Sequence, residues 1–355
     1  MFLWPTRLRN AIAEILAVES TIRVAVVGAG AFGRNHLRVY RELEQAGVPV
    51  ALAAVVDADA ELAAKAGEEW GIPAYRSVDE LAAAGLAVDA ASVCVPTSAH
   101  FVVASALLER DIDLLIEKPI AASTDEADRL IEIAGRRGRV LQVGHLERFN
   151  PAVAAIQPYL NGPMFFEAHR LSVFTPRALD VDVVLDLMIH DLDIVLKLAA
   201  SPVREVRAVG LPILSNKVDI ANVRLEFESG CVANFTASRV STELVRKLRF
   251  FQPHQYVSID YARKDLLIIN VDGGLDGAMP LDPAAGRAGL SFSKPVVVQG
   301  EPLRLEIESF LRAVRTRETP VVSGRDGRAA LALALLINAA IEDHADSAGL
   351  KRFHS

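Results

Sequence analysis

A short apolar run rich in β-branched residues, 21–27, ends abruptly in three glycines spaced as G-x-G-x-x-G, and a helical pattern over 34–46 follows. Strand, glycine turn and helix form the first half of a βαβ unit. The first glycine permits the tight turn, the second lets backbone approach a pyrophosphate, and the third lets helix and strand pack closely. The helix start adds unpaired N–H groups for the phosphates. The predicted cofactor contacts in this turn are Gly28, Ala29, Gly30, Ala31, Phe32 and Gly33.

The same alternation continues through the first 145 residues. Strands that are apolar throughout, each followed by a helix, indicate a parallel sheet covered on both faces. We therefore predict an α/β chain whose residues 21–145 form a doubly wound Rossmann domain, after an N-terminal extension over 1–20. The expected strands are 50–56, 74–75, 88–95, 113–116 and 140–144, and the expected helices are 60–70, 78–84, 99–109 and 125–137.

The pattern changes after residue 146. Strand signals follow one another from 203 to 299, with few helical patterns between them, which favours a large, mostly antiparallel sheet. We predict an α+β substrate and oligomerisation domain over 146–325, and a C-terminal segment, 326–355, whose helix packs near the first domain. Within these two segments we expect helices at 151–160, 181–199, 301–315 and 326–342, an early strand at 164–174 and a late one at 294–300.

Composition excludes several classes of protein. The net charge of −7 comes without any basic stripe, so a nucleic-acid partner has little support. No stretch reaches the roughly 18 apolar residues that cross a bilayer, and residues 1–20 are typical of a short leading helix rather than a secretory signal. Cys94 and Cys231, far apart in sequence, are interpreted as small buried hydrophobes in a reducing compartment. We expect a cytoplasmic protein.

An acid follows the glycine turn at the position where dinucleotide domains use one. Asp57 ends the second predicted strand, 24 residues after Gly33. A carboxylate there can accept hydrogen bonds from the adenosine ribose and repels a 2′-phosphate, which favours NAD over NADP as the cofactor. A nearby arginine could still accommodate the phosphate. Asp57 could also be a plain turn residue of a Rossmann-like domain that holds no cofactor.

Two of the later predicted strands, 88–95 and 113–116, end in loops that contain a proline and several polar side chains, VPTSAH and EKP. In an open parallel sheet, ligands collect beyond the carboxyl ends of the strands. A lysine there, Lys118, can hold a substrate oxygen and stabilise charge that develops on it. The alternative is an ordinary solvated loop, and sequence does not decide whether either X-Pro bond in these loops is cis. The further predicted cofactor contacts are Pro96, Thr97, His100, Glu117 and Lys118.

The helix predicted over 181–199 carries Asp182, Asp186, His190 and Asp193 at spacings that place them on one face. Asp186 could orient the His190 ring and leave the other ring nitrogen free for proton transfer. Two alternatives remain open: a solvated acidic face with a spectator histidine, or a metal bound by one histidine and three carboxylates. No cysteine or second nearby histidine supports a metal, so our prediction includes none.

Taken in order, GAGAFGRNH, CVPTSAH, EKP and DLMIHDLD resemble the motifs of the glucose–fructose oxidoreductase/inositol dehydrogenase/MocA (Gfo/Idh/MocA) family, from residue 21 onward. The resemblance implies hydride transfer between NAD(P) and a hydroxyl or carbonyl carbon, commonly of a sugar or polyol. It gives Lys118 the role of the family's active-site lysine, and Asp186 and His190 that of its acid/base pair. It also implies a homodimer or homotetramer formed through the open face of the C-terminal sheet.

A narrower resemblance lies in residues 142–151 (QVGHLERFNP), which are similar to a segment of the family's UDP-N-acetylglucosamine 3-dehydrogenases. Many relatives have Gly in place of Met188. Arg148 and Asn150 could contact a diphosphate or sugar, or could be a structural arginine and a helix N-cap. The alternatives are a dehydrogenase or reductase of inositol, glucose or an aldose, a non-catalytic NAD-binding regulatory protein, and a structural dimerisation protein. The predicted substrate contacts are Lys118, His145, Arg148, Asn150, Arg170, Asp186 and His190.

Overall fold

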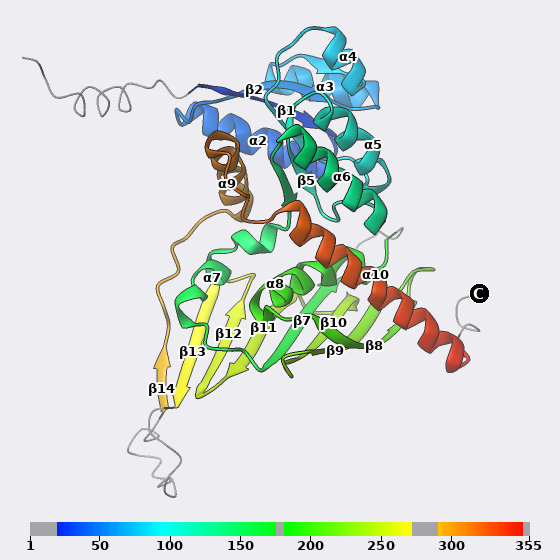
Figure 1. Cartoon of the computed structure of the whole chain (residues 1–355), viewed down its shortest axis with the longest axis vertical. Coiled ribbons are helices and arrows are strands. Elements are labelled where there is room, and N and C mark those ends of the chain that lie inside the picture. Colours follow the sequence, from blue (N-terminus) through cyan, green and yellow to red (C-terminus); the bar gives the residue numbers. More distant parts are fainter. Residues whose placement is uncertain (1–19, 175–180, 272–289, 351–355) are drawn as a thin grey trace, which may run out of the picture.

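The structure, a computed structural model, describes residues 20–174, 181–271 and 290–350, so all but one residue of the predicted N-terminal extension lies outside the described residues. Six parallel strands form the first sheet, in the order β3-β2-β1-β4-β5-β6, which confirms the predicted doubly wound Rossmann domain (Figure 1). Its elements are β1 (Ile22–Val27), α2 (Ala31–Gln45), β2 (Val50–Val56), α3 (Ala60–Trp70), β3 (Ala74–Tyr75), α4 (Val78–Ala83), β4 (Ala90–Val93), α5 (Thr97–Leu108), β5 (Asp113–Glu117), α6 (Thr124–Arg137) and β6 (Leu141–Gly144).

Helices cover both faces of this sheet because its central strands are apolar on both sides. Leu107 of α5 and Leu130 of α6 pack on one face, and Leu37 of α2 packs on the other. Helix α9 (Pro302–Thr316) joins α2 there through Ile307 and Phe310, although its sequence position had placed it in the second domain. Helix α9 therefore completes the core of the first domain, although it comes late in the sequence.

The second sheet has the order β14-β13-β12-β11-β7-β10-β9-β8, in which β7 and β10 are parallel and the other pairs are antiparallel. Helices α8 (Ile189–Ala199) and α10 (Gly324–Ser347) lie on one face of it (Figure 1). The strands are β7 (Phe165–Val173), β8 (Val203–Leu211), β9 (Ile220–Phe227), β10 (Val232–Ser241), β11 (Val245–Gln252), β12 (Gln255–Asp260), β13 (Asp265–Val271) and β14 (Leu290–Ser293). The mostly antiparallel second domain is thus confirmed.

Two local predictions in this domain were wrong. The single helix expected over 151–160 is a short helix, α7 (Pro151–Ala154), followed by a 3₁₀ turn, Gln157–Tyr159. Pro158 lacks the N–H that a continuous helix would use. Residues 294–300, expected as a strand, run without a ladder partner among the described residues.

Helix α10 joins the two cores. A Cβ at Gly327 would lie 2.6 Å from Val143 of β6, so only glycine lets this helix approach the first sheet so closely. Ile337 and Ile341, further along α10, belong to the core of the second domain. Every helix in the described part of the chain is too short or too polar to cross a membrane.

Candidate active site

The glycine turn forms the floor of a cavity of about 750 Å³ at the carboxyl ends of β1 and β2. Gly28 has φ +100°, and a Cβ there would lie 2.6 Å from the backbone of Cys94. A Cβ at Gly33 would lie 1.8 Å from the Gly28 oxygen, so neither position tolerates a side chain. Gly30 has no atom within 4 Å of its Cβ position, which leaves backbone open to a ligand. This cradle fits the pyrophosphate of a dinucleotide.

Asp57 lies at the wall of the same cavity and is tied to the glycine turn. Its Oδ2 accepts a 2.6 Å hydrogen bond from the Ala29 N–H, and its Oδ1 accepts one of 2.9 Å from the Asp59 N–H. The carboxylate is therefore fixed where ribose hydroxyls would meet it. Arg76, just beyond β3, lines the cavity as well and is the arginine best placed to meet a 2′-phosphate.

A second cavity, of about 720 Å³, continues from the first, with which it shares Phe32, Cys94, Val95 and Pro96. Together the two form one groove across the strand ends. Cys94, expected to be buried, is only half-buried because it follows the last residue of β4, where the groove opens. The predicted residues that line this second cavity are Phe32, Pro96, Thr97, His100, Glu117, Lys118, Arg170, Asp186 and His190.

Lys118 directly follows β5, and its side chain reaches the π-helical turn, Val184–Met188, that precedes α8. Its Nζ donates a 2.7 Å hydrogen bond to the backbone carbonyl of Asp186 and lies 3.6 Å from Asp186 Oδ1. Burial lowers the pKa of Lys118 from its usual value, while the charges of Asp186 and Glu117 oppose that shift. The peptide bond between Lys118 and Pro119 is cis. The amine is therefore a fixed donor that faces the cavity.

His190 lines the same cavity as Lys118. Burial, and then the charges of Lys118 and Arg170, hold the pKa of His190 well below 6.5. The imidazole is therefore neutral at pH 7 and able to accept a proton. His190 and Lys118 thus face one space, although they are far apart in the sequence.

The contact by which Asp186 was expected to orient the His190 ring, accepting from a ring N–H, is absent from the described contacts, in which His190 Nδ1 has no partner. The Asp186 carboxylate lies beside Lys118 instead. The helix expected over 181–199 begins as a π-helical turn, Val184–Met188, and continues as α8. A π turn closes its hydrogen bonds from residue i to i+5 rather than from i to i+4. The regular α-helix expected over the whole of 181–199 was therefore wrong in its first part.

The acidic residues of this segment separate to different partners rather than sharing one face. Asp182 accepts hydrogen bonds from two backbone N–H groups of the π turn. Asp193 binds Arg148 through contacts of 2.7 and 2.8 Å. Asp191, which the spacing argument had left out, binds Arg170 in the same two-pronged way at 2.7 and 2.9 Å. The carboxylates thus serve as structural ties, apart from Asp186.

The predicted substrate contacts near the domain junction lie mostly behind the cavity wall. Arg148 is engaged with Asp193, and Asn150 caps α7 and donates to the Tyr261 carbonyl. His145 is buried, with its ring centroid 6.2 Å from that of His190. Of these four predicted contacts, Arg170 lines the cavity, whereas His145, Arg148 and Asn150 are not among the described residues that line it.

His100 ties together the two loops that carry the site. Its Nδ1 lies 2.8 Å from the Pro119 carbonyl and its Nε2 lies 2.9 Å from the Val95 carbonyl. One loop follows β4 and the other follows β5. The ring therefore fixes the spacing between the strand-end loops of the groove.

Arg246 of β11 is a residue of the cavity wall that the sequence argument missed. It lies directly opposite Arg170 of β7 in the sheet register. Arg170 is neutralised by Asp191 and Glu147, whereas Arg246 is exposed and its side chain makes no ion pair within the described ranges. The available signal was strand alternation, which could not reveal that the side chain faces this cavity.

Comparison with known proteins agrees with this geometry. The chain matches a family model described as an oxidoreductase family with an NAD-binding Rossmann fold over residues 22–145, and a GFO/IDH/MocA C-terminal domain over 159–251. It is 38% identical over 322 residues to the UDP-N-acetylglucosamine 3-dehydrogenase of Acidithiobacillus ferrooxidans, covering 90% of this chain and 97% of that protein. A myo-inositol 2-dehydrogenase of Thermotoga maritima is 24% identical, over 91% and 97% of the two chains.

Solved structures show the same fold. The structure of the Acidithiobacillus ferrooxidans enzyme superposes with a TM-score of 0.82 at 37% identity, covering 91% of this chain and 98% of that one. A levoglucosan dehydrogenase in complex with NADH and L-sorbose superposes with a TM-score of 0.79 at 17% identity, covering 91% and 97%. The second likeness concerns the fold alone.

Proposed function

The chain belongs to the Gfo/Idh/MocA family of NAD-binding oxidoreductases, and from that premise we propose that it oxidises the 3-hydroxyl of UDP-N-acetylglucosamine to a ketone, with NAD as hydride acceptor. The observation that carries the proposal is the placement of Lys118, Asp186 and His190 on one cavity that continues into the dinucleotide groove. The choice of substrate is supported by the relative that is 38% identical over 90% of the chain.

The two catalytic side chains divide the work at the reacting hydroxyl. NAD held by the glycine turn and Asp57 would supply the acceptor for the hydride that leaves carbon 3 of the sugar. The neutral imidazole of His190 accepts the hydroxyl proton as the carbon–oxygen double bond forms. The Lys118 amine donates a hydrogen bond to the same oxygen and stabilises the negative charge that develops there. Asp186, through its backbone carbonyl and its carboxylate, keeps that amine in place.

The dinucleotide would lie across the strand ends. The groove offers the turn of Gly28 to Gly33 for the pyrophosphate, Asp57 for the adenosine ribose, and Glu117 beside Lys118 for the nicotinamide half. Asp57 favours NAD because its negative charge would repel a 2′-phosphate. Arg76 on the same wall is the group that sets how strong this preference is.

Arg246 supports a substrate that carries a diphosphate. Like charges directly opposite each other in a sheet are destabilising. Here Arg170 is already paired with Asp191 and Glu147, so an anion in the cavity would balance Arg246. A nucleotide sugar supplies that anion, whereas a free polyol does not. Arg148 and Asn150 would then hold the cavity wall in place rather than touch the substrate.

A homo-oligomer formed through the second sheet completes the proposal. Helices α8 and α10 cover one face of that sheet. On the other face the rings of Phe165, Phe251 and Tyr256 form a row, with centroids 5.7 and 5.2 Å apart, and Phe251 is 39% exposed. An exposed aromatic row of this kind is typical of a protein interface. Light scattering coupled to size exclusion would test it.

A spectrophotometric assay tests the activity. We expect absorbance at 340 nm to rise when the protein is mixed with NAD and UDP-N-acetylglucosamine, and mass spectrometry to detect a product two hydrogens lighter. Free N-acetylglucosamine, UDP-glucose and myo-inositol serve as comparison substrates. Turnover of free myo-inositol that exceeds turnover of the nucleotide sugar would contradict the proposal and favour a polyol dehydrogenase. NAD binding without turnover of any of these would favour a regulatory protein.

A further inference from the structure

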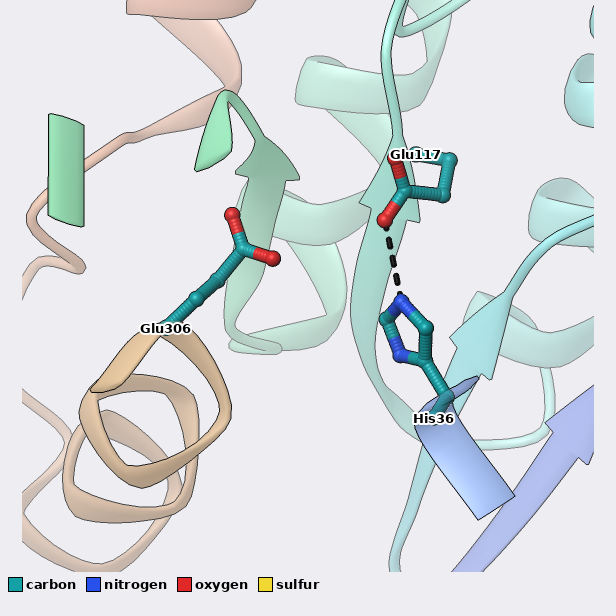
Figure 2. A group of neighbouring side chains, drawn as sticks. All are labelled: His36, Glu117 and Glu306. Carbon is teal, nitrogen blue, oxygen red and sulfur yellow. Dashed lines mark hydrogen bonds and ion pairs between the residues drawn. The ribbon is translucent and has the colours of Figure 1, made fainter. Parts of the chain in front are cut away.

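Behind the wall of the groove, three ionisable side chains from distant segments meet in the core. His36 comes from α2, Glu117 from the end of β5 and Glu306 from α9, and Figure 2 shows the Glu306 carboxyl group pointing toward the other two. A side-chain nitrogen or oxygen of each lies within 4.8 Å of the others. All three are buried, and Glu306 is completely so. The mechanism proposed above uses neither His36 nor Glu306.

Both ring nitrogens of His36 have hydrogen-bond partners. Its Nε2 lies 3.0 Å from Glu117 Oε1, and its Nδ1 lies 3.1 Å from the hydroxyl of Ser92. The Ser92 hydroxyl is in turn 2.9 Å from the hydroxyl of Tyr40. An ionised carboxylate only accepts, so a neutral His36 donates from Nε2 to Glu117 and accepts from Ser92, which accepts from Tyr40. Each polar atom in this series of hydrogen bonds then has a partner without any bound ion.

Glu306 is the one residue of this three-residue cluster that takes no part in these hydrogen bonds. Neither of its carboxyl oxygens has a hydrogen-bond partner in the described part of the chain. A buried, unpartnered carboxylate next to a second negative charge is strongly unfavourable. Burial, and then the charge of Glu117, raise the pKa of Glu306 well above 4.5. The group therefore carries a proton at neutral pH.

We propose that Glu306 is a positioning residue, a neutral carboxylic acid whose proton is directed at Glu117 through one bridging water, and which thereby holds Glu117 in the groove wall. The separation of at most 4.8 Å matches the span of one bridging water. A Cβ at Gly144 would lie 2.8 Å from Glu117 Oε1, so backbone closes off the other side of that carboxylate. His36, Gly144 and Glu306 together leave the Glu117 carboxylate one orientation, within the wall that lines the groove.

A bound divalent cation is the competing account of the same cluster. One histidine and two carboxylates are a donor set that such ions accept. A metal would have to replace the hydrogen bond between His36 and Glu117, which is already of ideal length. A proton on Glu306 satisfies the cluster without that loss. The proton is therefore the simpler occupant.

Glu306→Gln tests the proposal, which rests on the NAD site proposed above. The amide is neutral and keeps an N–H donor, so we expect wild-type affinity for NADH in a fluorescence titration. Glu306→Leu has no donor, and its NADH affinity should fall by about tenfold, as expected for one lost hydrogen bond. Glu308→Gln, on the half-exposed side of α9, is the matched control. Equal affinities of the Gln, Leu and wild-type proteins would overturn the proposal.

The pH dependence of NADH affinity distinguishes a protonated Glu306 from a side chain that only fills space in the core. As pH rises through the pKa of Glu306, the wild-type protein should lose NADH affinity, because two charges then repel each other across the cluster. Glu306→Gln should remove this loss. The pKa values of Cys94 and Tyr40 are raised chiefly by burial and in part by the charge of Glu306, so Cys94→Ala and Tyr40→Phe must retain the alkaline loss of affinity. Retention of the alkaline loss in Glu306→Gln would contradict the proposal.

Two measurements are independent of NAD and of activity. Infrared spectroscopy should detect a protonated, buried carboxyl group in the wild-type protein that is missing from Glu306→Gln. Elemental analysis should find less than one bound zinc or manganese per chain, and a stoichiometric metal that is lost in Glu306→Gln would overturn the proposal. If the infrared signal is present but NADH does not bind at any pH, the proposed function fails while the protonation of Glu306 stands.

Discussion

The amine of Lys118 donates a 2.7 Å hydrogen bond to the backbone carbonyl of Asp186, 68 residues later in the chain. Lys118 directly follows β5 of the first domain, and Asp186 lies in the π turn that precedes α8 of the second. This bond and the neighbouring carboxylate fix a donor in the cavity between the two domains. The geometry of the proposed catalytic residues thus depends on how the two domains pack against each other.

Substitution Lys118→Met should reduce turnover with little effect on NADH binding. The methionine keeps the side-chain length but cannot donate to the substrate oxygen, and loss of such a donor costs about 100- to 1,000-fold in kcat. Steady-state kinetics and an NADH titration measure the two effects. Lys65→Met, at an exposed position of α3, is the control and should match the wild-type protein. A Lys118→Met variant with unchanged kcat would refute the role given to the amine.

The titration of His190 should reveal its cationic neighbours. Its pKa is held well below 6.5 by burial and then by Lys118 and Arg170, so the neutral, proton-accepting ring persists into acid. Removing the Lys118 charge takes away one cause, and the pKa of His190 should therefore rise in Lys118→Met. NMR titration of the imidazole measures this without relying on activity. His190→Ala should lose about 100- to 10,000-fold in turnover while it still binds NADH.

Three histidines, His190 among them, make the stability of the fold depend on pH. His190, His145 and His100 all have pKa values lowered chiefly by burial, so the folded state binds fewer protons than the unfolded chain below about pH 6.5. Their contribution is therefore complete above pH 6.5 and is lost as pH falls below it. Urea denaturation at pH 5.5 and 7.5 should show a smaller free energy of unfolding at the lower pH. A His145→Gln variant should show a weaker dependence on pH.

Cofactor preference should depend on Asp57 and Arg76. Asp57→Ser removes the charge that would repel a 2′-phosphate, and Arg76 is then free to meet that phosphate. We expect kcat/KM for NADP to rise relative to that for NAD in Asp57→Ser. The double variant Asp57→Ser/Arg76→Ala should lose most of that gain. If the single variant gains nothing with NADP, the adenosine ribose does not lie where the groove places it.

Arg246→Met tests the nucleotide-sugar substrate. The KM for UDP-N-acetylglucosamine should rise by about 10- to 100-fold, the loss expected for a charge-assisted hydrogen bond to a phosphate, while the KM for NAD stays unchanged. Arg249→Met is the control, because strand alternation places Arg249 on the other face of β11, near Glu167. An equal effect of the two substitutions would show that the cavity does not hold the diphosphate.

The first domain and the central residues of the candidate site could be predicted from local sequence patterns. A glycine turn whose Gly28 and Gly33 exclude any side chain is visible in the sequence because no other residue fits there. Lys118 and His190 were found because each belongs to a recognisable motif, EKP and Asp-x-x-x-His. What the sequence did not reveal depends on docking: α9 packs on the first sheet, Arg246 reaches the cavity from a strand, and Asp186 contacts Lys118 across the two domains.

The buried Arg170 illustrates the same limit and gives the last prediction. Sequence position suggested a substrate contact, but two carboxylates hold its guanidinium at 2.7 to 2.9 Å, and the ring of Tyr261 lies 5.2 Å away. Arg170→Met leaves Asp191 and Glu147 buried without a counter-charge, which should lower the free energy of unfolding by about 3–5 kcal/mol.

A double variant separates this structural role from a catalytic one. In Arg170→Met/Asp191→Leu the stranded charge at Asp191 is gone, so the loss of stability should be smaller than the sum of the two single losses. Urea denaturation of the four proteins gives the coupling energy. Additive losses would show that the pair does not stabilise the fold, and a stable Arg170→Met protein with a raised substrate KM would return Arg170 to the substrate.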